Sequence, residues 1–239
     1  MILISAYYIH DVAILKKFNE GHYKLTVCKS VRSKGSEGFT KKRGVNSKKL
    51  DNNISRAKSK VREYALCNDF DYFVTLTIDK DKYDRHDFKA YYKALGQFLL
   101  NYGKNHKSKI RYVLIPEMHE DGAWHMHGLI GGVLDKHLEE NSNGYLEWKQ
   151  YTKKFGYMSL GVIKDKNKVA SYITKYITKE MGNTVGELEA SMYYCSKGLK
   201  CAEEIKRGTL FADNIPFDFV NDYVKIKTFY DDSITNLIR

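Results

Sequence analysis

Two histidines separated by one residue, His125 and His127, lie in an apolar segment of the chain. Side chains alternate across a β-strand, so residues two apart share one face and can bind the same ion. Neutral imidazoles bind divalent transition metals, and a carboxylate beside them would complete a three-ligand set with positions open for substrate. Two exposed histidines on an ordinary strand give the same pattern, so the pair needs a third ligand before it indicates a metal site.

Glu117 is the candidate third ligand, and the register of a predicted β-hairpin over residues 109–132 decides whether it can serve. A two-residue turn at 121–122 would point Glu117 away from His125. A three-residue loop at 120–122 pairs these two residues and brings the carboxylate and both imidazoles to one face. The glycine that closes this loop suits a type I turn followed by a G1 bulge. The metal-site hypothesis therefore requires the three-residue loop, in which His119 also reaches this face as a spare ligand or a supporting group.

A second candidate for chemistry is the segment 166–182, which is predicted to be a helix ended by Gly182. Tyr172 and Tyr176 are four residues apart and share one helical face, and lysines follow each of them by three residues. A phenol beside ammonium groups can attack a phosphodiester, because the ammonium groups offset the charge on the phosphate. Taken alone, the segment fits an ordinary amphipathic helix with half-buried tyrosines better.

Three segments in order resemble the three motifs of HUH endonucleases. They are FVTLT at 73–77, HMHGLI at 125–130 and VASYITKYITK at 169–179. The resemblance covers about residues 54–210 and is closest to the rolling-circle replication initiators (Rep proteins) of bacterial plasmids, small single-stranded DNA phages and related mobile elements. Relaxases place their tyrosine ahead of the histidines, whereas here it follows them, which favours the initiators.

The resemblance implies an enzyme, a nickase that cuts and rejoins single-stranded origin DNA through a covalent 5′-phosphotyrosine intermediate. Glu117 matches the carboxylate ligand of some branches, and it would hold one Mg²⁺ or Mn²⁺ together with His125 and His127. Tyr172 stands at the position of the nucleophile in the family pattern. Tyr176 would act with it or reverse the step.

Two further groups of residues complete the candidate site. Lys175 and Lys179 would orient the phosphate, with Lys175 the stronger candidate. The threonines Thr75 and Thr77 of the first motif are expected to pack within a buried strand rather than to contact DNA.

The chain carries 40 Lys and Arg against 29 Asp and Glu, a net charge of +11 that favours a polyanionic partner. The surplus is concentrated between residues 29 and 62, so this segment is the candidate for contacting the DNA backbone; a solvated basic loop is the alternative. Its candidate DNA-binding residues are Lys41, Lys42, Arg43, Lys48, Lys49 and Arg56.

Hydrophobic periodicity predicts strands at 71–78, 109–132 (as a hairpin) and 157–163, and helices at 53–68, 87–102, 145–156 and 166–182. Asp87 is the predicted cap of the second helix, and Gly103 is its predicted stop. This order indicates an α+β protein, and the resemblance implies a ferredoxin-like or RRM-like domain. We expect a central antiparallel sheet with helices packed mainly on one face. The expected domains are N-terminal strands and a basic loop at 1–52, the endonuclease domain at 53–210, and a C-terminal extension at 211–239.

Several classes are disfavoured. The four cysteines form no CxxC pair, which argues against a zinc knuckle, and no stretch of 18 apolar residues or secretory signal is found. No membrane partner and a cytoplasmic location are therefore expected, and the resemblance implies that the cell is a bacterial host. The chain has no P-loop, so a host or separately encoded helicase and a polymerase would be partners at single-stranded or hairpin origin DNA. The rival readings are a non-catalytic RRM-like binding module, a phosphodiesterase that activates water, and a tyrosine transposase.

Overall fold

The computed structural model describes residues 12–28, 47–178, 191–212, 214–221, 224–231, 235–236 and 238. The chain divides into two compact units. One comprises residues 45–200, and the other joins residues 1–44 to residues 201–239. All three motifs lie within the range of the larger unit.

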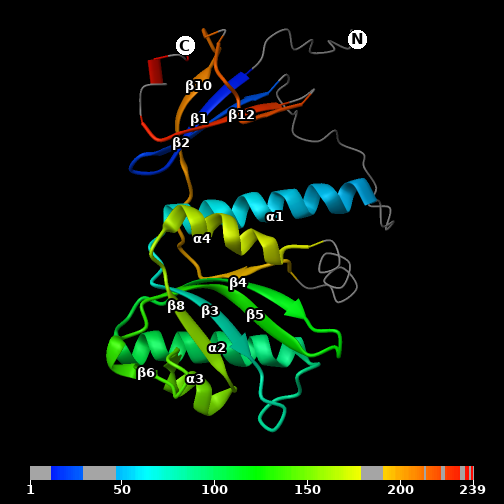
Figure 1. The fold of residues 1–239 in the computed structure, drawn as a ribbon, viewed down its shortest axis with the longest axis vertical. Coiled ribbons are helices and arrows are strands. Elements are labelled where there is room, and N and C mark those ends of the chain that lie inside the picture. The colour runs from blue at the N-terminus through cyan, green and yellow to red at the C-terminus, as the bar shows by residue number, and fades with distance from the viewer. Residues whose placement is uncertain are drawn as a thin grey trace, which may run out of the picture. The chain divides into compact units, whose positions relative to one another are not determined.

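The larger unit is built on an antiparallel sheet of seven described strands (Figure 1). Their order across the sheet is β6-β7-β8-β3-β5-β4-β9. Strands β3 and β5, which contain the first two motifs, are therefore flanked by strands on both sides. The strands are β3 (Tyr72–Thr77), β4 (Arg111–Met118), β5 (Trp124–Gly131), β6 (Leu138–Glu140), β7 (Leu146–Trp148), β8 (Met158–Val162) and β9 (Tyr194–Cys195).

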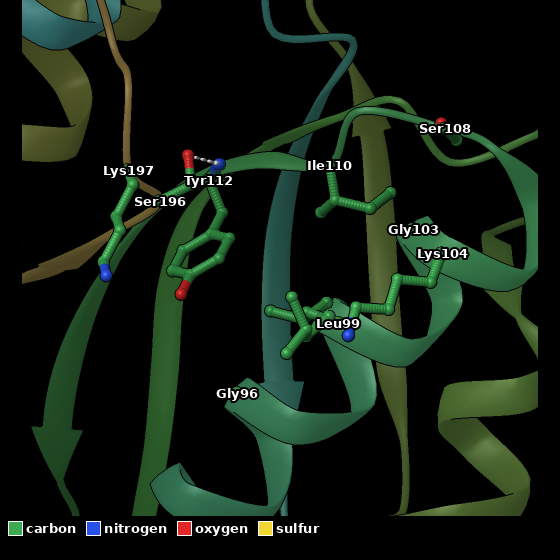
Figure 2. Close-up of a pocket in the computed structure, with 10 residues that line it drawn as sticks. Gly96, Leu99, Gly103, Lys104, Ser108, Ile110, Tyr112, Ser196 and Lys197 are labelled. Atoms are coloured by element: carbon green, nitrogen blue, oxygen red, sulfur yellow. Dashed lines mark hydrogen bonds between the residues drawn. The ribbon is translucent and has the colours of Figure 1, made fainter.

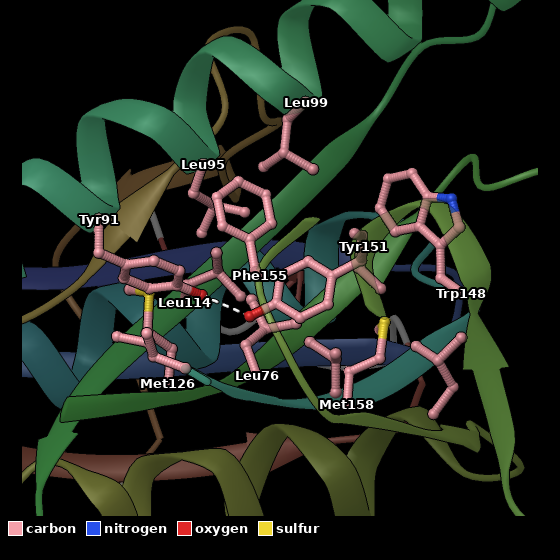
Figure 3. Packing of buried hydrophobic residues seen from close by; sticks show 14 of the residues in the cluster. Leu76, Tyr91, Leu95, Leu99, Leu114, Met126, Trp148, Tyr151, Phe155 and Met158 are labelled. Carbon is pink, nitrogen blue, oxygen red and sulfur yellow. Dashed lines mark hydrogen bonds between the residues drawn. The ribbon is translucent and has the colours of Figure 1, made fainter. Parts of the chain in front are cut away.

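One face of this sheet carries the main hydrophobic core. Alternate residues of the central strands, such as Leu76 and Met126, are fully or almost fully buried against α2 (Phe88–His106) and α3 (Lys149–Lys154). Figure 3 shows the aromatic and aliphatic side chains of the two layers interdigitating. The two-residue period of the strands therefore separates this apolar face from the face that carries the histidines.

The opposite face is covered by α1 (Ser47–Cys67), α4 (Lys166–Tyr172) and a short 3₁₀ helix, η2 (Ile173–Tyr176) (Figure 1). Helix α1 buries Ile54, Ala57, Val61 and Ala65, whose spacing of three to four residues marks one side of a helix. The predicted α+β class and central antiparallel sheet are confirmed. The helices, however, cover both faces of the sheet rather than mainly one.

Helix α2 begins where the sequence predicts and ends later. The side chain of Asp87 caps its first turn by accepting a hydrogen bond from the backbone N–H of Ala90. The predicted stop at Gly103 is wrong, because the helix continues to His106 and ends at Lys107, which is left-handed with φ of 51°.

The tyrosine helix is shorter than predicted. The α-helix ends at Tyr172, the next four residues form η2, and residues 177–178 are not helical. Residues 179–182 of the predicted helix lie outside the described residues. The segment from Ile173 to Thr178 is rich in β-branched residues, which have low helix propensity, and the Thr174 hydroxyl donates a hydrogen bond to the carbonyl of Ser171. The chain therefore changes from an α-helix to a 3₁₀ helix between the two tyrosines.

The predicted helix at 145–156 is also shorter. Residues 146–148 form β7, which pairs with β6 and β8, and only residues 149–154 are helical. The described residues 135–137 form a 3₁₀ turn, η1 (Asp135–His137), ahead of β6.

The smaller unit is a five-stranded antiparallel sheet in the order β10-β1-β2-β12-β11. Strands from both ends of the chain pair here, a connection that the sequence pattern did not indicate. Its buried side chains include Leu15, Leu25 and Ile238. The strands are β1 (Val12–Asn19), β2 (His22–Cys28), β10 (Glu203–Gly208), β11 (Phe219–Val220) and β12 (Val224–Phe229). In the described part of the chain, no helix has the length and hydropathy needed to span a membrane.

Candidate metal and tyrosine site

The hairpin of β4 and β5 has the register that the metal hypothesis requires. Glu117 is paired directly with His125. The backbone N–H of His119 donates to the carbonyl of Ala123, and the N–H of Gly122 donates to the carbonyl of His119, both at 2.9 Å. Gly122 has φ of +79°, a conformation that glycine adopts without strain. The predicted three-residue loop at 120–122 is therefore confirmed.

Three donor atoms converge above the hairpin: Nε2 of His125, Nε2 of His127 and Oε2 of Glu117, here called the donor triangle. Its sides are 2.9 Å between the two imidazoles, 2.9 Å from His125 to Glu117 and 3.0 Å from His127 to Glu117. Donor atoms this close together could jointly bind one divalent ion, which would keep further positions open for substrate and water.

Burial keeps the two imidazoles in the form that binds metal. Their side chains are 7% and 13% exposed, while that of Glu117 is 39% exposed. Burial lowers the pKa of His125, and burial together with the neighbouring His125 lowers the pKa of His127 to about 4; Glu117 opposes both shifts. Both rings are therefore neutral near pH 7. His119 is exposed and stacks on the His125 ring at 3.9 Å between centroids, so it reaches this face as predicted.

Thr75 contacts the second histidine from the neighbouring strand. It is paired with His127 across β3 and β5, and its Oγ1 lies 3.1 Å from Nδ1 of that ring. The sequence interpretation treated this threonine as strand packing and missed the contact. Only the register between two strands that lie about 50 residues apart in sequence could have revealed it, and no local signal encodes that register.

The two tyrosines lie together beside the donor triangle. The ring of Tyr176 stacks on the ring of His127, with 4.0 Å between centroids and 19° between planes. The hydroxyls of Tyr172 and Tyr176 are 3.1 Å apart, and the Tyr172 ring meets Phe73 edge-on at 5.4 Å. Tyr172 is 44% exposed. Burial and the hydrogen bond to Tyr172 raise the pKa of Tyr176, so its neutral form is favoured.

The predicted basic residues are placed as follows. Lys175 is exposed, and its ammonium lies 5.1 Å from the centroid of the Tyr172 ring. Arg56 is exposed on α1. Lys48 and Lys49 fall in the first turn of α1, whose side chains there are not described. Outside the described residues lie Lys41, Lys42, Arg43 and Lys179.

A separate pocket of about 520 Å³ lies between α2 and the start of β4 (Figure 2). Leu99, Ile110 and Tyr112 form its apolar part, and Lys104 and Lys197 are among its polar residues. Because α2 packs on the face of the sheet opposite to the histidines, this pocket is not part of the metal and tyrosine site.

A sheet that carries a two-histidine, one-carboxylate cluster beside helical tyrosines is compatible with an HUH site. Residues 71–181 match the family model of the replication-associated protein ORF2. That family is a rolling-circle Rep family, so the resemblance inferred from the motifs is confirmed over these residues. No curated protein and no solved structure gave a significant match to the chain.

Proposed function

We propose that this protein initiates rolling-circle replication by nicking, and later rejoining, one strand of origin DNA. The observation that carries the proposal is the packing of a tyrosine ring on a candidate metal ligand, Tyr176 on His127 at 4.0 Å. The hydroxyl of Tyr172 is hydrogen-bonded to that of Tyr176, so two phenol oxygens lie together on the side of the sheet that carries the donor triangle. The family match supports a role in replication.

Glu117, His125 and His127 would hold one Mg²⁺ or Mn²⁺, because their three donor atoms lie 2.9–3.0 Å from one another on one face of the hairpin. Bound there, the ion would act as a Lewis acid on a non-bridging oxygen of the scissile phosphate. The neutral imidazoles and the carboxylate together bring a single negative charge. An ion held by them keeps a net positive charge that attracts the phosphate.

Tyr172 is the first candidate for the nucleophile. Its half-exposed ring is accessible to a DNA strand, and the ammonium of Lys175 lies nearby to offset charge on the phosphate. Its phenol oxygen attacks phosphorus and releases its proton to water. The bond between phosphorus and the 3′ oxygen breaks, and that oxygen takes a proton from water. The products are a 5′-phosphotyrosine and a free 3′-hydroxyl, which a polymerase can extend.

Tyr176 is the second candidate, because its hydroxyl lies only 3.1 Å from that of Tyr172. The phosphotyrosine is itself a diester, so attack by a DNA 3′-hydroxyl rejoins the strand without an outside energy source. Attack by the second tyrosine would transfer the strand between the two side chains. Lys179 would serve Tyr176 as Lys175 serves Tyr172.

The remaining roles follow from the same function. The substrate would be single-stranded or hairpin origin DNA, bound in part by the basic residues Lys41, Lys42, Arg43, Lys48, Lys49 and Arg56. A host or separately encoded helicase would open the duplex, and the reaction would take place in the bacterial cytoplasm. The sequence predicts an endonuclease domain at residues 53–210, but β10 at 203–208 pairs with β1, so the domain would correspond to the larger unit of residues 45–200.

The test is a covalent-adduct assay. Single-stranded oligonucleotides that tile the replicon encoding the protein are incubated with it in Mn²⁺ or in EDTA and resolved on denaturing gels. We expect an SDS-resistant adduct that requires metal and is lost in Tyr172→Phe, or only in the Tyr172→Phe/Tyr176→Phe double variant. Tyr145→Phe is the matched control, because Tyr145 is 56% exposed in the loop between β6 and β7.

Other results would assign the rival functions. Cleavage without an adduct would indicate a phosphodiesterase that activates water. Binding without cleavage, across a pool that contains the origin, would indicate an RRM-like binding module. An adduct formed at the ends of a mobile element, rather than at a replication origin, would indicate a transposase.

A further inference from the structure

We infer that Thr75 is a positioning residue that orients the imidazole of His127 for metal binding. The inference rests on the proposed function for the metal's role, but the contact itself is independent of that function. Thr75 lies opposite His127 in neighbouring strands, with Oγ1 3.1 Å from Nδ1.

The chemistry of imidazole explains why this contact matters. A neutral imidazole carries its proton on one nitrogen, and a metal needs the lone pair on the other. Nε2 of His127 belongs to the donor triangle, so Nδ1 must carry the proton when a metal is bound. Nδ1–H would then donate to Thr75 Oγ1, which would hold the ring with the lone pair of Nε2 directed at the ion. Without metal the hydroxyl can donate to Nδ1 and Nε2–H can donate to Glu117, so the contact orients the ring in either tautomer.

The strand holds the threonine hydroxyl in place. Thr75 is β-branched, so its first side-chain torsion has few allowed values. It lies in β3, which is paired on one side with β5 and on the other with β8. The backbone of Thr75 is therefore fixed by hydrogen bonds from both sides, and the hydroxyl in turn restrains the ring of His127. Tyr176 stacks on the same ring, so the position of this tyrosine also depends on it.

The neighbouring pair in the same two strands lacks this contact. Thr77 is paired with His125. Among the described residues, the Nδ1 atom of His125 is buried without a hydrogen-bond partner, and no hydrogen bond of the Thr77 hydroxyl is found. Two threonines on one strand face thus oppose two histidines, and only one of them orients its partner. This difference makes Thr77 the matched control for Thr75.

The experiment uses full-length protein and compares wild type with Thr75→Val, Thr75→Ser and Thr77→Val. Calorimetry measures the Mn²⁺ affinity of each, and urea denaturation measures its stability. We expect Thr75→Ser and Thr77→Val to keep the affinity of the wild type. Loss of such an orienting partner typically weakens metal binding about 10- to 100-fold, and we expect that loss in Thr75→Val alone.

Two results would overturn the inference. One is an unchanged Mn²⁺ affinity in Thr75→Val, and the other is an equal loss of affinity in Thr77→Val, which would indicate a general packing effect. Valine has the shape of threonine and a high β-propensity, so the variant should fold, and the serine variant provides the rescue. If the wild type binds no Mn²⁺, the metal site of the proposed function fails; if it binds Mn²⁺ and Thr75→Val binds equally well, only the role of Thr75 fails.

Discussion

Two tyrosine pairs are hydrogen-bonded hydroxyl to hydroxyl on opposite faces of one sheet. Tyr91 and Tyr151 meet at 2.7 Å in the core between α2 and α3, where both are fully buried (Figure 3). Tyr172 and Tyr176 meet at 3.1 Å beside the histidines, where Tyr172 is 44% exposed. The same kind of tyrosine pair therefore occurs in two environments, one fully buried and one partly exposed.

The surroundings of each pair decide what it can do. Burial raises the pKa of both Tyr91 and Tyr151 far above the ordinary value, and no ammonium or imidazole is recorded next to either ring among the described residues. The second pair lies beside His127 and Lys175 and is open to solvent. Tyrosine pairing alone therefore does not indicate catalysis; under the proposed function, access for DNA and neighbouring positive charge would distinguish Tyr172 and Tyr176 from the buried pair.

The largest expected effect comes from removing the carboxylate of the donor triangle. Glu117→Ala should weaken Mn²⁺ binding by about 100-fold or more, because the ion loses an anionic ligand. Calorimetry measures the affinity, and Glu120→Ala, an exposed carboxylate in the adjoining turn, is the control. An unchanged affinity in Glu117→Ala would mean that the metal does not bind on this face, and the two faces of the sheet would then differ less in function.

The next effect is on stability and comes from the opposite face. Met126 stands between the two histidines in sequence but is completely buried in the core. Met126→Ala should lower the free energy of unfolding by about 3 kcal/mol, from lost burial and the cavity left behind. Urea denaturation measures it, with the exposed Leu100→Ala as control. A change below about 1 kcal/mol would contradict the assignment of this face as the core.

Loss of a hydroxyl should lower the stability more in the buried tyrosine pair than in the partly exposed one. Tyr151→Phe leaves the buried Tyr91 hydroxyl without its partner and should cost about 1–2 kcal/mol of stability, with the covalent adduct retained. Tyr172→Phe removes a hydroxyl from a half-exposed ring and should cost less than about 0.5 kcal/mol. Urea denaturation and the adduct assay together check this. Equal stability losses in the two variants would contradict the distinction between a buried structural pair and a partly exposed pair.

The smallest effect concerns DNA affinity. Arg56 is exposed on α1, on the histidine side of the sheet, whereas Lys89 is exposed on α2, on the other side. Arg56→Ala should weaken binding of a single-stranded oligonucleotide a few-fold and reduce its salt slope by about 0.7, because one phosphate contact is lost. Fluorescence anisotropy at several salt concentrations measures both. The same change in Lys89→Ala would mean that the histidine side is not the DNA side.

The secondary-structure predictions succeeded where the periodicity was long and failed at element ends. The cap at Asp87 and the strand at 72–77 are local features, and the sequence located both. The stop at Gly103 and the long tyrosine helix were wrong. Helix α2 continues past its glycine to His106, and the β-branched run changes the other helix to 3₁₀ after Tyr172. The helices on the second face of the sheet were not expected, since amphipathic patterns show that a helix is buried but not against which face.

The sequence by itself determined the residues of the candidate site. Local spacing places His125 and His127 on one strand face and the two tyrosines on one helix, because side-chain direction follows from the periods of strand and helix. A glycine-closed turn also favoured the register that brings Glu117 to them.

Only the tertiary structure decided how these pieces meet. The stacking of Tyr176 on His127, the contact of Thr75 with His127, and the sheet formed by strands from both ends of the chain join residues far apart in sequence. Such contacts depend on strand order, register and helix docking. These arise from burial of apolar surface summed over the whole unit, which no short window of sequence contains.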